Sequence, residues 1–143
     1  MFPQNPRDIM DDSGHGERVF DLEFRAVNEE LQRVRHALRN WLRDIVTDEH
    51  HAYDILLAVG EACTNSVEHG HRGDGRNLRV RATADDVQVR ITIVDGGTWR
   101  VHRSLPDTDR GRGLRLMRTL VPEVNIRTSG TGTVVELATP LSA

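Results

Sequence analysis

The stretch 57-LAVGEACTNSVEHG-70 carries the most informative pattern in the chain. Glu61, Asn65 and Glu68 follow one another at intervals of four and three residues, so their side chains share one face of a helix, with Ala58 expected nearby. A carboxylate and an amide placed in this way can hold a divalent cation through oxygen, or position a water or hydroxyl for attack. The alternative is the solvated face of an ordinary amphipathic helix, and the spacing alone favours this alternative.

Two helices are expected in this half of the chain. Apolar residues at intervals of three and four between Val27 and Val46 predict the first helix. The second is expected from about Asp48, whose carboxylate suits the positive end of the helix dipole, to Gly70, a natural stop. The apolar stripe of the second helix is predicted to comprise Ile55, Leu56, Val59, Ala62, Cys63, Ser66 and Val67.

Apolar residues with a period of two predict the strands. The segment "RVFDLEFRA", which begins at Arg18, is interpreted as a first strand at a sheet edge. Residues 78–82 and 87–93 predict an antiparallel hairpin around the turn "ADD", with Val87 in its apolar alternation. The segments "VNIRTS" and "TVVELAT" predict a second hairpin around "GTG".

Between the two hairpins, a loop is expected up to Arg112, followed by a short helix from about Gly113 that Pro122 closes. The order of elements is therefore strand, two helices, hairpin, loop and helix, and a terminal hairpin. This order predicts an α+β fold in which helices cover one face of a mixed or antiparallel sheet.

Length and composition favour one cytosolic domain. The 143 residues suit a single domain, expected at 17–143 after a leader, 1–16, whose low apolar content predicts disorder. A net charge of -3 offers no general attraction to nucleic acid or to an anionic membrane. The single cysteine, Cys63, excludes an internal disulfide and is expected to be a small buried hydrophobe. No signal peptide or unbroken membrane-spanning run is present in the sequence.

A second motif, "IVDGG", places Asp95 at the end of an apolar strand and directly before two glycines. A carboxylate in this position can accept hydrogen bonds from an exocyclic amine, and glycine allows the backbone to approach a flat ligand closely. The alternative is an ordinary strand end followed by a turn, where Asp and Gly are common.

A third motif, "DRGRGLRLMRTLVP", places Gly111 and Gly113 at the expected start of a helix. Arg110 precedes the first glycine, and Arg112 lies between the two. Free backbone N–H groups, the positive end of the helix dipole and guanidinium groups together favour an anion such as a phosphate chain. The pattern is not the dinucleotide fingerprint, because the third glycine would fall at Leu116. A helix-capping loop is the alternative.

The histidines do not fit a zinc site. His69 and His71 flank a glycine, and no cysteine or second histidine pair supplies the remaining ligands. These two residues, together with His50 and His51, are interpreted as helix-end and surface histidines.

The order of the three motifs, followed by "GTGTVVEL", resembles a GHKL-type ATPase domain, and specifically the small anti-sigma-factor serine/threonine kinases of bacterial partner-switching systems. The resemblance covers residues 18–140. The stretches "LAVGEACTNSVEHG" and "GRGLRLMRTLVPEV" are its most specific parts. It implies a Bergerat-type two-layer sandwich, with helices over one face of a mixed, mostly antiparallel sheet.

The resemblance also implies roles for individual residues. Glu61 would be the catalytic base, Asn65 would coordinate a Mg²⁺ that bridges the ATP phosphates, and His69 would have a structural part near the helix end. Residues 98–112 would form a short lid over ATP. The implied nucleotide-binding residues are Asn65 at the metal, Asp95, Gly97 and Thr133 at the adenine, and Gly111, Arg112, Gly113 and Leu114 near the phosphates.

The function that the resemblance implies is that of a cytoplasmic protein kinase. It would use MgATP to phosphorylate a serine or threonine of an anti-sigma-factor antagonist, would otherwise sequester a sigma factor, and could form a homodimer, with no direct contact to nucleic acid or membrane. One position departs from the family pattern, because Trp99 stands where a second glycine is usual. Two alternatives therefore stay open: a nucleotide-binding regulatory module that acts by protein binding without phosphoryl transfer, and, more remotely, an ATP-hydrolysing conformational switch.

Overall fold

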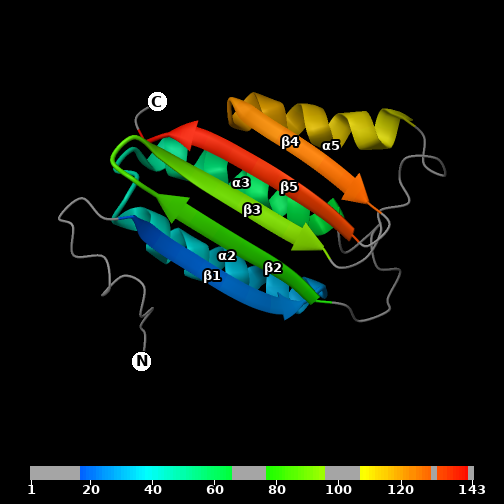
Figure 1. Cartoon of the computed structure of the whole chain (residues 1–143), viewed down its shortest axis with the longest axis horizontal. Helices are drawn as coiled ribbons and strands as arrows, with labels where there is room; N and C mark the ends of the chain where they lie inside the picture. Colours follow the sequence, from blue (N-terminus) through cyan, green and yellow to red (C-terminus); the bar gives the residue numbers. More distant parts are fainter. Residues whose placement is uncertain (1–16, 66–76, 96–106, 130–131, 142–143) are drawn as a thin grey trace.

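The computed structural model describes residues 17–65, 77–95, 107–129 and 132–141; for 107–113, 128, 129 and 132 it describes the backbone alone. Figure 1 shows a layer of strands with helices behind it. In chain order the elements are β1 Arg18–Arg25, α2 Asn28–Arg43, α3 Glu49–Asn65, β2 Asn77–Ala84, β3 Gln88–Asp95, α5 Asp107–Leu120, β4 Glu123–Ser129 and β5 Gly132–Pro140.

The strands form one sheet in the order β1-β2-β3-β5-β4, and every described pairing is antiparallel. The predicted α+β class, the edge strand at Arg18 and both hairpins are thereby confirmed. The sheet is antiparallel throughout its described strands, which settles the alternative between a mixed and an antiparallel sheet.

The turn between β2 and β3 is held by Asp85. Its Oδ1 accepts hydrogen bonds from the backbone N of Val87 at 2.7 Å and of Gln88 at 2.9 Å. These bonds, with that from Gln88 the largest contribution, lower the pKa of the Asp85 carboxyl. The predicted place of Val87 in the strand is wrong, because this residue belongs to the turn and its side chain is 71% exposed. The buried alternation begins at Val89 instead.

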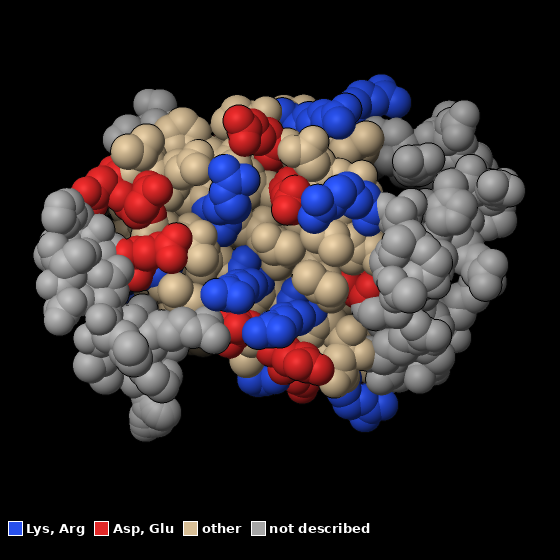
Figure 2. Space-filling view, in the orientation of Figure 1, with Lys and Arg blue, Asp and Glu red and all other residues tan. Residues whose placement is uncertain are grey.

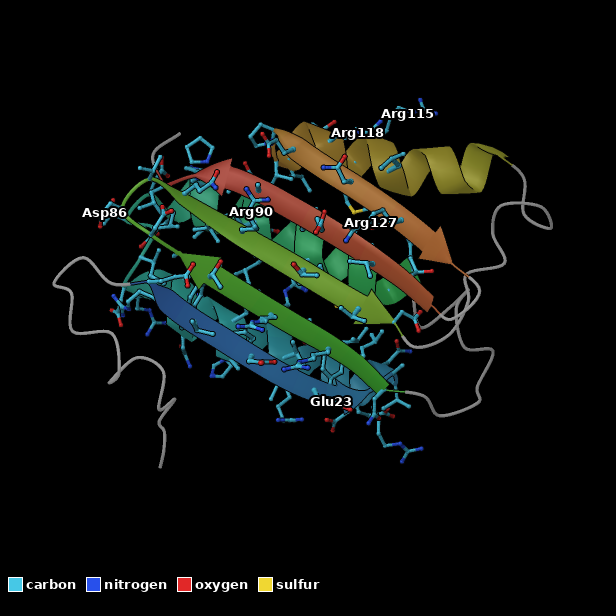
Figure 3. All side chains as sticks on the ribbon, in the orientation of Figure 1. Glu23, Asp86, Arg90, Arg115, Arg118 and Arg127 are labelled. Carbon is cyan, nitrogen blue, oxygen red and sulfur yellow. The ribbon has the colours of Figure 1, made fainter. Side chains whose placement is uncertain are left out.

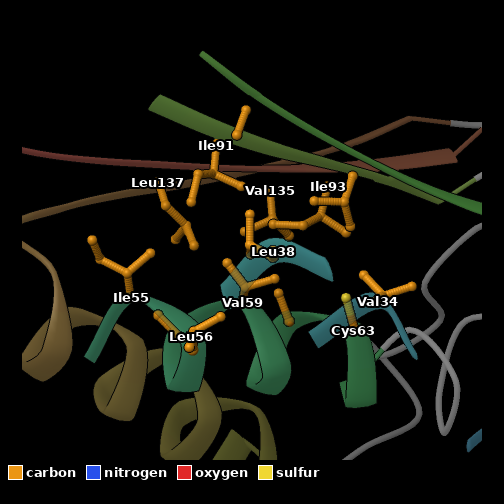
Figure 4. Close-up of a cluster of buried hydrophobic side chains, with 14 of the residues drawn as sticks. Val34, Leu38, Ile55, Leu56, Val59, Cys63, Ile91, Ile93, Val135 and Leu137 are labelled. Carbon is orange, nitrogen blue, oxygen red and sulfur yellow. The ribbon is translucent and has the colours of Figure 1, made fainter. Parts of the chain in front are cut away.

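The hydrophobic core lies between the sheet and the helices. Figure 4 shows Ile55 and Val59 of α3 facing Ile91 and Leu137 of the sheet, with Leu38 of α2 beside them. All five side chains are buried. Burial of a side chain of this size contributes roughly 1.5–3 kcal/mol, so these contacts hold the two layers together.

The face of the sheet away from the helices is charged (Figure 2). Arg79 donates to Asp21 through Nε at 2.8 Å and through Nη2 at 2.7 Å, and this carboxylate raises the pKa of Arg79. Arg127 Nη2 lies 3.2 Å from Glu136 Oε2. Arg90 and Arg127 both project from this face (Figure 3). The polar face explains why the helices cover only the other one.

Helix α3 begins after Asp48, as predicted. Asp48 Oδ1 accepts from His50 N at 2.9 Å and from His51 N at 3.3 Å, which satisfies two backbone N–H groups of the first turn. The expected continuation from 66 to Gly70 lies outside the described residues. Ala58 is fully buried, so the face of α3 that it shares with Glu61 and Asn65 is not solvated along its whole length.

Ala58 is buried because α5 packs against α3, and β4 also contacts α5. Met117 and Val121 at the end of α5 are themselves buried. Helix α3 is therefore covered on three sides, by the sheet, by α2 and by α5. The apolar stripe of α3 predicted from the sequence did not indicate the contact with α5.

Helix α5 begins at Asp107, and the predicted start near Gly113 is wrong. Two aspartates, Asp107 and Asp109, stand in its first turn, where they suit the positive end of the helix dipole. Glycine in a helix interior costs only about 1 kcal/mol relative to alanine, so Gly111 and Gly113 do not prevent this extension.

The interpretation of the pair at the start of α3 as surface histidines holds for His50 only. His50 is exposed, whereas His51 is 7% exposed. His51 Nε2 donates to the backbone O of Pro140 at 2.7 Å, and Thr139 Oγ1 lies 3.3 Å from the same nitrogen. His51 therefore ties the start of α3 to the end of β5.

Candidate functional site

The segments that carry the three motifs meet at one end of the molecule. In Figure 1 the end of α3, the end of β3, the start of β5 and the start of α5 all lie toward the right-hand side. We call this the site end and define it by Asn65, Asp95 and Thr133, which stand at three of these termini. Residues far apart in sequence thus reach one region because α3 and β3 run in the same direction.

Asp95 is the last residue of β3 and is 1% exposed. It faces the core side of the sheet, where the preceding residues on that face, Ile91 and Ile93, are apolar. Its partner across β3 and β5 is Thr133, also 1% exposed. Because a buried carboxylate is costly, packing alone does not account for Asp95 and Thr133 at these positions. They are suited to recognising the polar edge of a ligand.

Glu61 and Asn65 lie one turn apart on α3, and both are half-buried. Helical geometry places them on the side of α3 that also carries the buried Ala58, which is the side toward α5. The polar stripe is therefore not a fully solvated helix face. The last residue of the stripe that the structure describes, Asn65, lies at the site end.

The side-chain oxygens of Glu61 and Asn65 on α3 suit a hard cation such as Mg²⁺. Amide and carboxylate oxygens suit this ion, which takes one or two protein ligands and fills its shell with phosphate and water. Within the parts of the chain that the structure describes, no group of three His, Cys, Asp or Glu side chains could hold a metal. A resident ion held by a full protein shell is thus not built from these residues, whereas an ion that arrives with phosphates would need only Asn65 and its neighbours.

The glycine-rich segment lies in the first half of α5. Gly111, Arg112 and Gly113 belong to the helix rather than to a loop before it, and Leu114 is half-buried against the core. Gly97 falls outside the described residues, as do Glu68, His69, Trp99, Arg100 and Arg103.

Cys63, on the same helix as Glu61, has no chemical role in this arrangement. It is 3% exposed, and burial raises the pKa of its thiol to about 12. The thiol therefore stays neutral and unreactive near pH 7. The prediction that Cys63 is a small buried hydrophobe is confirmed.

The sequence analysis missed a set of arginines on α2. Arg35, Arg39 and Arg43 line a groove between α2 and α3. Their spacing of four residues was visible in the sequence and places them on one stripe.

The histidine kinase-like ATPase domain family matches this chain over residues 24–139, and the chain belongs to that family. The match includes all the described helices and the four strands after β1.

The relatives of this chain are small bacterial regulators. The anti-sigma F factor of Pasteuria penetrans is 31% identical, and the alignment covers 86% of this chain and 91% of that protein. The anti-sigma F factor of Clostridium beijerinckii is 33% identical, with coverage of 80% and 88%. The serine-protein kinase RsbW of Bacillus pumilus is 32% identical, with coverage of 57% and 60%.

A solved structure supports the same fold. The crystal structure of the RsbU and RsbW domains of a Mycobacterium tuberculosis protein matches with a TM-score of 0.65 and 27% identity. The match covers 85% of this chain and 32% of the other, so this chain spans about a third of that protein's length. None of the described helices is long and apolar enough to cross a membrane.

Proposed function

We propose that this chain is a MgATP-dependent serine/threonine-protein kinase that phosphorylates an anti-sigma-factor antagonist, and that it sequesters a sigma factor when it is not engaged with that antagonist. The observation that carries the proposal is the buried Asp95–Thr133 pair at the same end of the molecule as Asn65. The names of the relatives, anti-sigma F factor and serine-protein kinase, support the choice of partner and reaction. Its place of action would be the cytoplasm, and a homodimer is part of the proposal.

The adenine would be recognised at the strand ends. The Asp95 carboxylate would accept a hydrogen bond from the exocyclic amine, with Thr133 across the strand and Gly97 beside the ring. The phosphates would lie toward α5, near Gly111, Arg112 and Gly113, with Leu114 at the border of the core.

Phosphoryl transfer needs positioning and charge neutralisation more than covalent chemistry from the protein. When bound, Mg²⁺ neutralises charge on the phosphates, and Asn65 is the residue that would hold it. The Glu61 carboxylate would take the proton of the acceptor hydroxyl while the hydroxyl oxygen bonds to the γ-phosphorus and the bond to ADP breaks. The half-buried position of Glu61 suits a base shielded from bulk water.

The proposal is tested with labelled ATP and a recombinant anti-sigma-factor antagonist of the same organism. Glu61→Gln is expected to lower the transfer rate at least about a hundredfold, because a positioned base contributes on that order. ATP affinity, measured by calorimetry, should change little. Glu29→Gln, an exposed carboxylate in the first turn of α2, is the matched control and should transfer phosphate normally.

The second candidate function is a nucleotide-binding module that regulates a partner by occlusion alone. The observation that favours it is Trp99, where the family pattern has glycine. This candidate predicts binding of ATP in calorimetry with no phosphate on the antagonist at any enzyme concentration. Transfer at the wild-type rate by Glu61→Gln would instead leave a kinase but remove Glu61 as its base.

A further inference from the structure

A groove of about 870 Å³ lies between α2 and α3. It is lined on the α2 side by Arg35, Arg39 and Arg43, and on the α3 side by Ala52, Tyr53 and Leu56. Helical geometry places these α3 residues on the side toward α2, away from Glu61 and Asn65. The groove is thus separate from the proposed nucleotide site.

One wall of the groove is a row of cations. Arg35, Arg39 and Arg43 are spaced by four residues, so they form one stripe that rises about 6 Å per step. All three are exposed, and none makes an ion pair with the residues that the structure describes. By contrast, Arg33 on another side of α2 has its Nη2 2.6 Å from Glu30 Oε1. The stripe therefore offers positive charge that the fold itself does not use.

The opposite wall combines apolar residues with Glu49 and His50 at the start of α3. Tyr53 is 54% exposed, which is unusual for a large ring in a chain with few aromatics, and Leu56 lies buried at the base of the groove. An aromatic ring of this kind provides a large apolar contact with a polar tip. A cationic wall facing an aromatic wall suits a ligand with one acidic and one apolar face.

We propose that the groove between α2 and α3 binds an acidic amphipathic segment of a partner protein, with carboxylates on the arginine stripe and apolar side chains against Tyr53. The stripe spans about 12 Å along α2, which matches carboxylates spaced by four residues on a docked helix. Glu49 also lines the groove and opposes either ligand. The choice rests on the apolar residues Tyr53 and Leu56, which an amphipathic helix covers and a phosphate backbone does not. The inference goes beyond the proposed function and does not depend on phosphoryl transfer.

The probe for this surface is a fluorescein-labelled synthetic helix of about 16 residues that carries glutamates at spacings of four and leucines on the adjoining face. Fluorescence anisotropy with the full chain at about 0.15 M salt should show saturable binding. The same peptide with glutamine in place of glutamate should bind at least about tenfold more weakly, because the carboxylates supply the complementary charge.

Variants of the protein decide where the probe binds. The triple change Arg35→Gln, Arg39→Gln and Arg43→Gln should weaken binding about tenfold or more. The matched control is Arg115→Gln with Arg118→Gln, two exposed arginines on α5, which should bind the probe as the wild type does.

Equal binding by the triple variant and the wild type would overturn the proposal. So would a short RNA that binds through the same arginines more tightly than the peptide. If the triple variant does not fold, Arg39→Gln against the charge-conserving Arg39→Lys replaces it, and only the lysine variant should retain affinity. ATP binding is measured in the same variants. Loss of peptide binding with ATP binding retained concerns the groove alone and leaves the proposed kinase function untouched.

Discussion

The two ends of the molecule use their polar residues differently. At the end opposite the site end, which we call the turn end, Asp85 holds the β2–β3 turn, His51 ties α3 to Pro140, and Leu141 N donates to Val87 O at 2.9 Å. These bonds connect neighbouring segments of the fold. At the site end, Asp95 and Thr133 stand buried beside the apolar Ile93 and Val135.

This difference separates stability from function. A polar group that bridges two elements, as His51 does, is explained by the fold it holds. A carboxylate buried at the end of a strand, where the ends of other elements also meet, is a candidate for ligand recognition. Changes at the turn end should therefore alter the free energy of unfolding, and changes at the site end should alter nucleotide affinity.

The largest effect is expected from Asp95→Asn. Loss of the carboxylate removes a charged hydrogen-bond acceptor for the adenine amine, so ATP affinity should fall about tenfold to a hundredfold. Calorimetry measures the affinity, and circular dichroism checks the fold. Asp86→Asn, an exposed aspartate in the turn at the opposite end (Figure 3), should leave affinity unchanged. Wild-type affinity in Asp95→Asn would break the contrast between the two ends.

A smaller effect, on stability alone, is expected from His51→Ala. This variant leaves the backbone O of Pro140 without its donor and should lower the free energy of unfolding by about 1–3 kcal/mol. Denaturant titration measures the change, and ATP affinity should stay the same. His50→Ala, its exposed neighbour, is the control and should unfold like the wild type. A loss of nucleotide affinity in His51→Ala would mean that the two ends are coupled.

Gly60→Ala tests the middle of α3 and should raise stability. A Cβ at Gly60 would meet no atom within 4 Å, and alanine is favoured over glycine in a helix by about 1 kcal/mol. The midpoint of denaturant unfolding should rise, with ATP affinity unchanged. An unchanged or lower midpoint would show that the added Cβ is not accommodated at Gly60 without cost, despite the open space around it.

The smallest effect is expected at Asp85 and depends on pH. Since its hydrogen bonds lower the folded-state pKa, its stabilisation is present above the unfolded pKa, near 4, and is lost as the pH falls through the lower folded value. Asp85→Ala should thus be less stable than the wild type at pH 7, and the difference should shrink in strong acid. If the stability difference between Asp85→Ala and the wild type did not change with pH, the ionised carboxylate of Asp85 would not be its cause. Asp86→Ala is the control.

The elements with strong local signals were predictable. The apolar period between Val27 and Val46 predicted α2, found at Asn28–Arg43, and alternation with turn residues predicted both hairpins. The start of α5 was missed, because glycines normally favour loops and here lie inside a helix. Ala58 was missed because its burial depends on α5, a partner that no local pattern in α3 names.

The structure describes only part of the predicted site. The family resemblance implied that Asp95 and Thr133 would be close, and the strand register pairs them directly. The spacing in the sequence predicted that Glu61 and Asn65 share one face of a helix. Both residues lie in α3, so this prediction is confirmed. The roles assigned to these residues, and to Gly97 outside the described part of the chain, stay predictions until nucleotide binding is measured.

The amino-acid sequence by itself determined most of the helices and strands, their main apolar faces and the residue types available for chemistry, because these follow from spacing and side-chain character along a local stretch. Only the tertiary structure decided which termini meet at the site end, that His51 is buried, and that the arginines of α2 face Tyr53 across a groove. These facts depend on how the layers pack, since burial and proximity are set by residues distant in the chain.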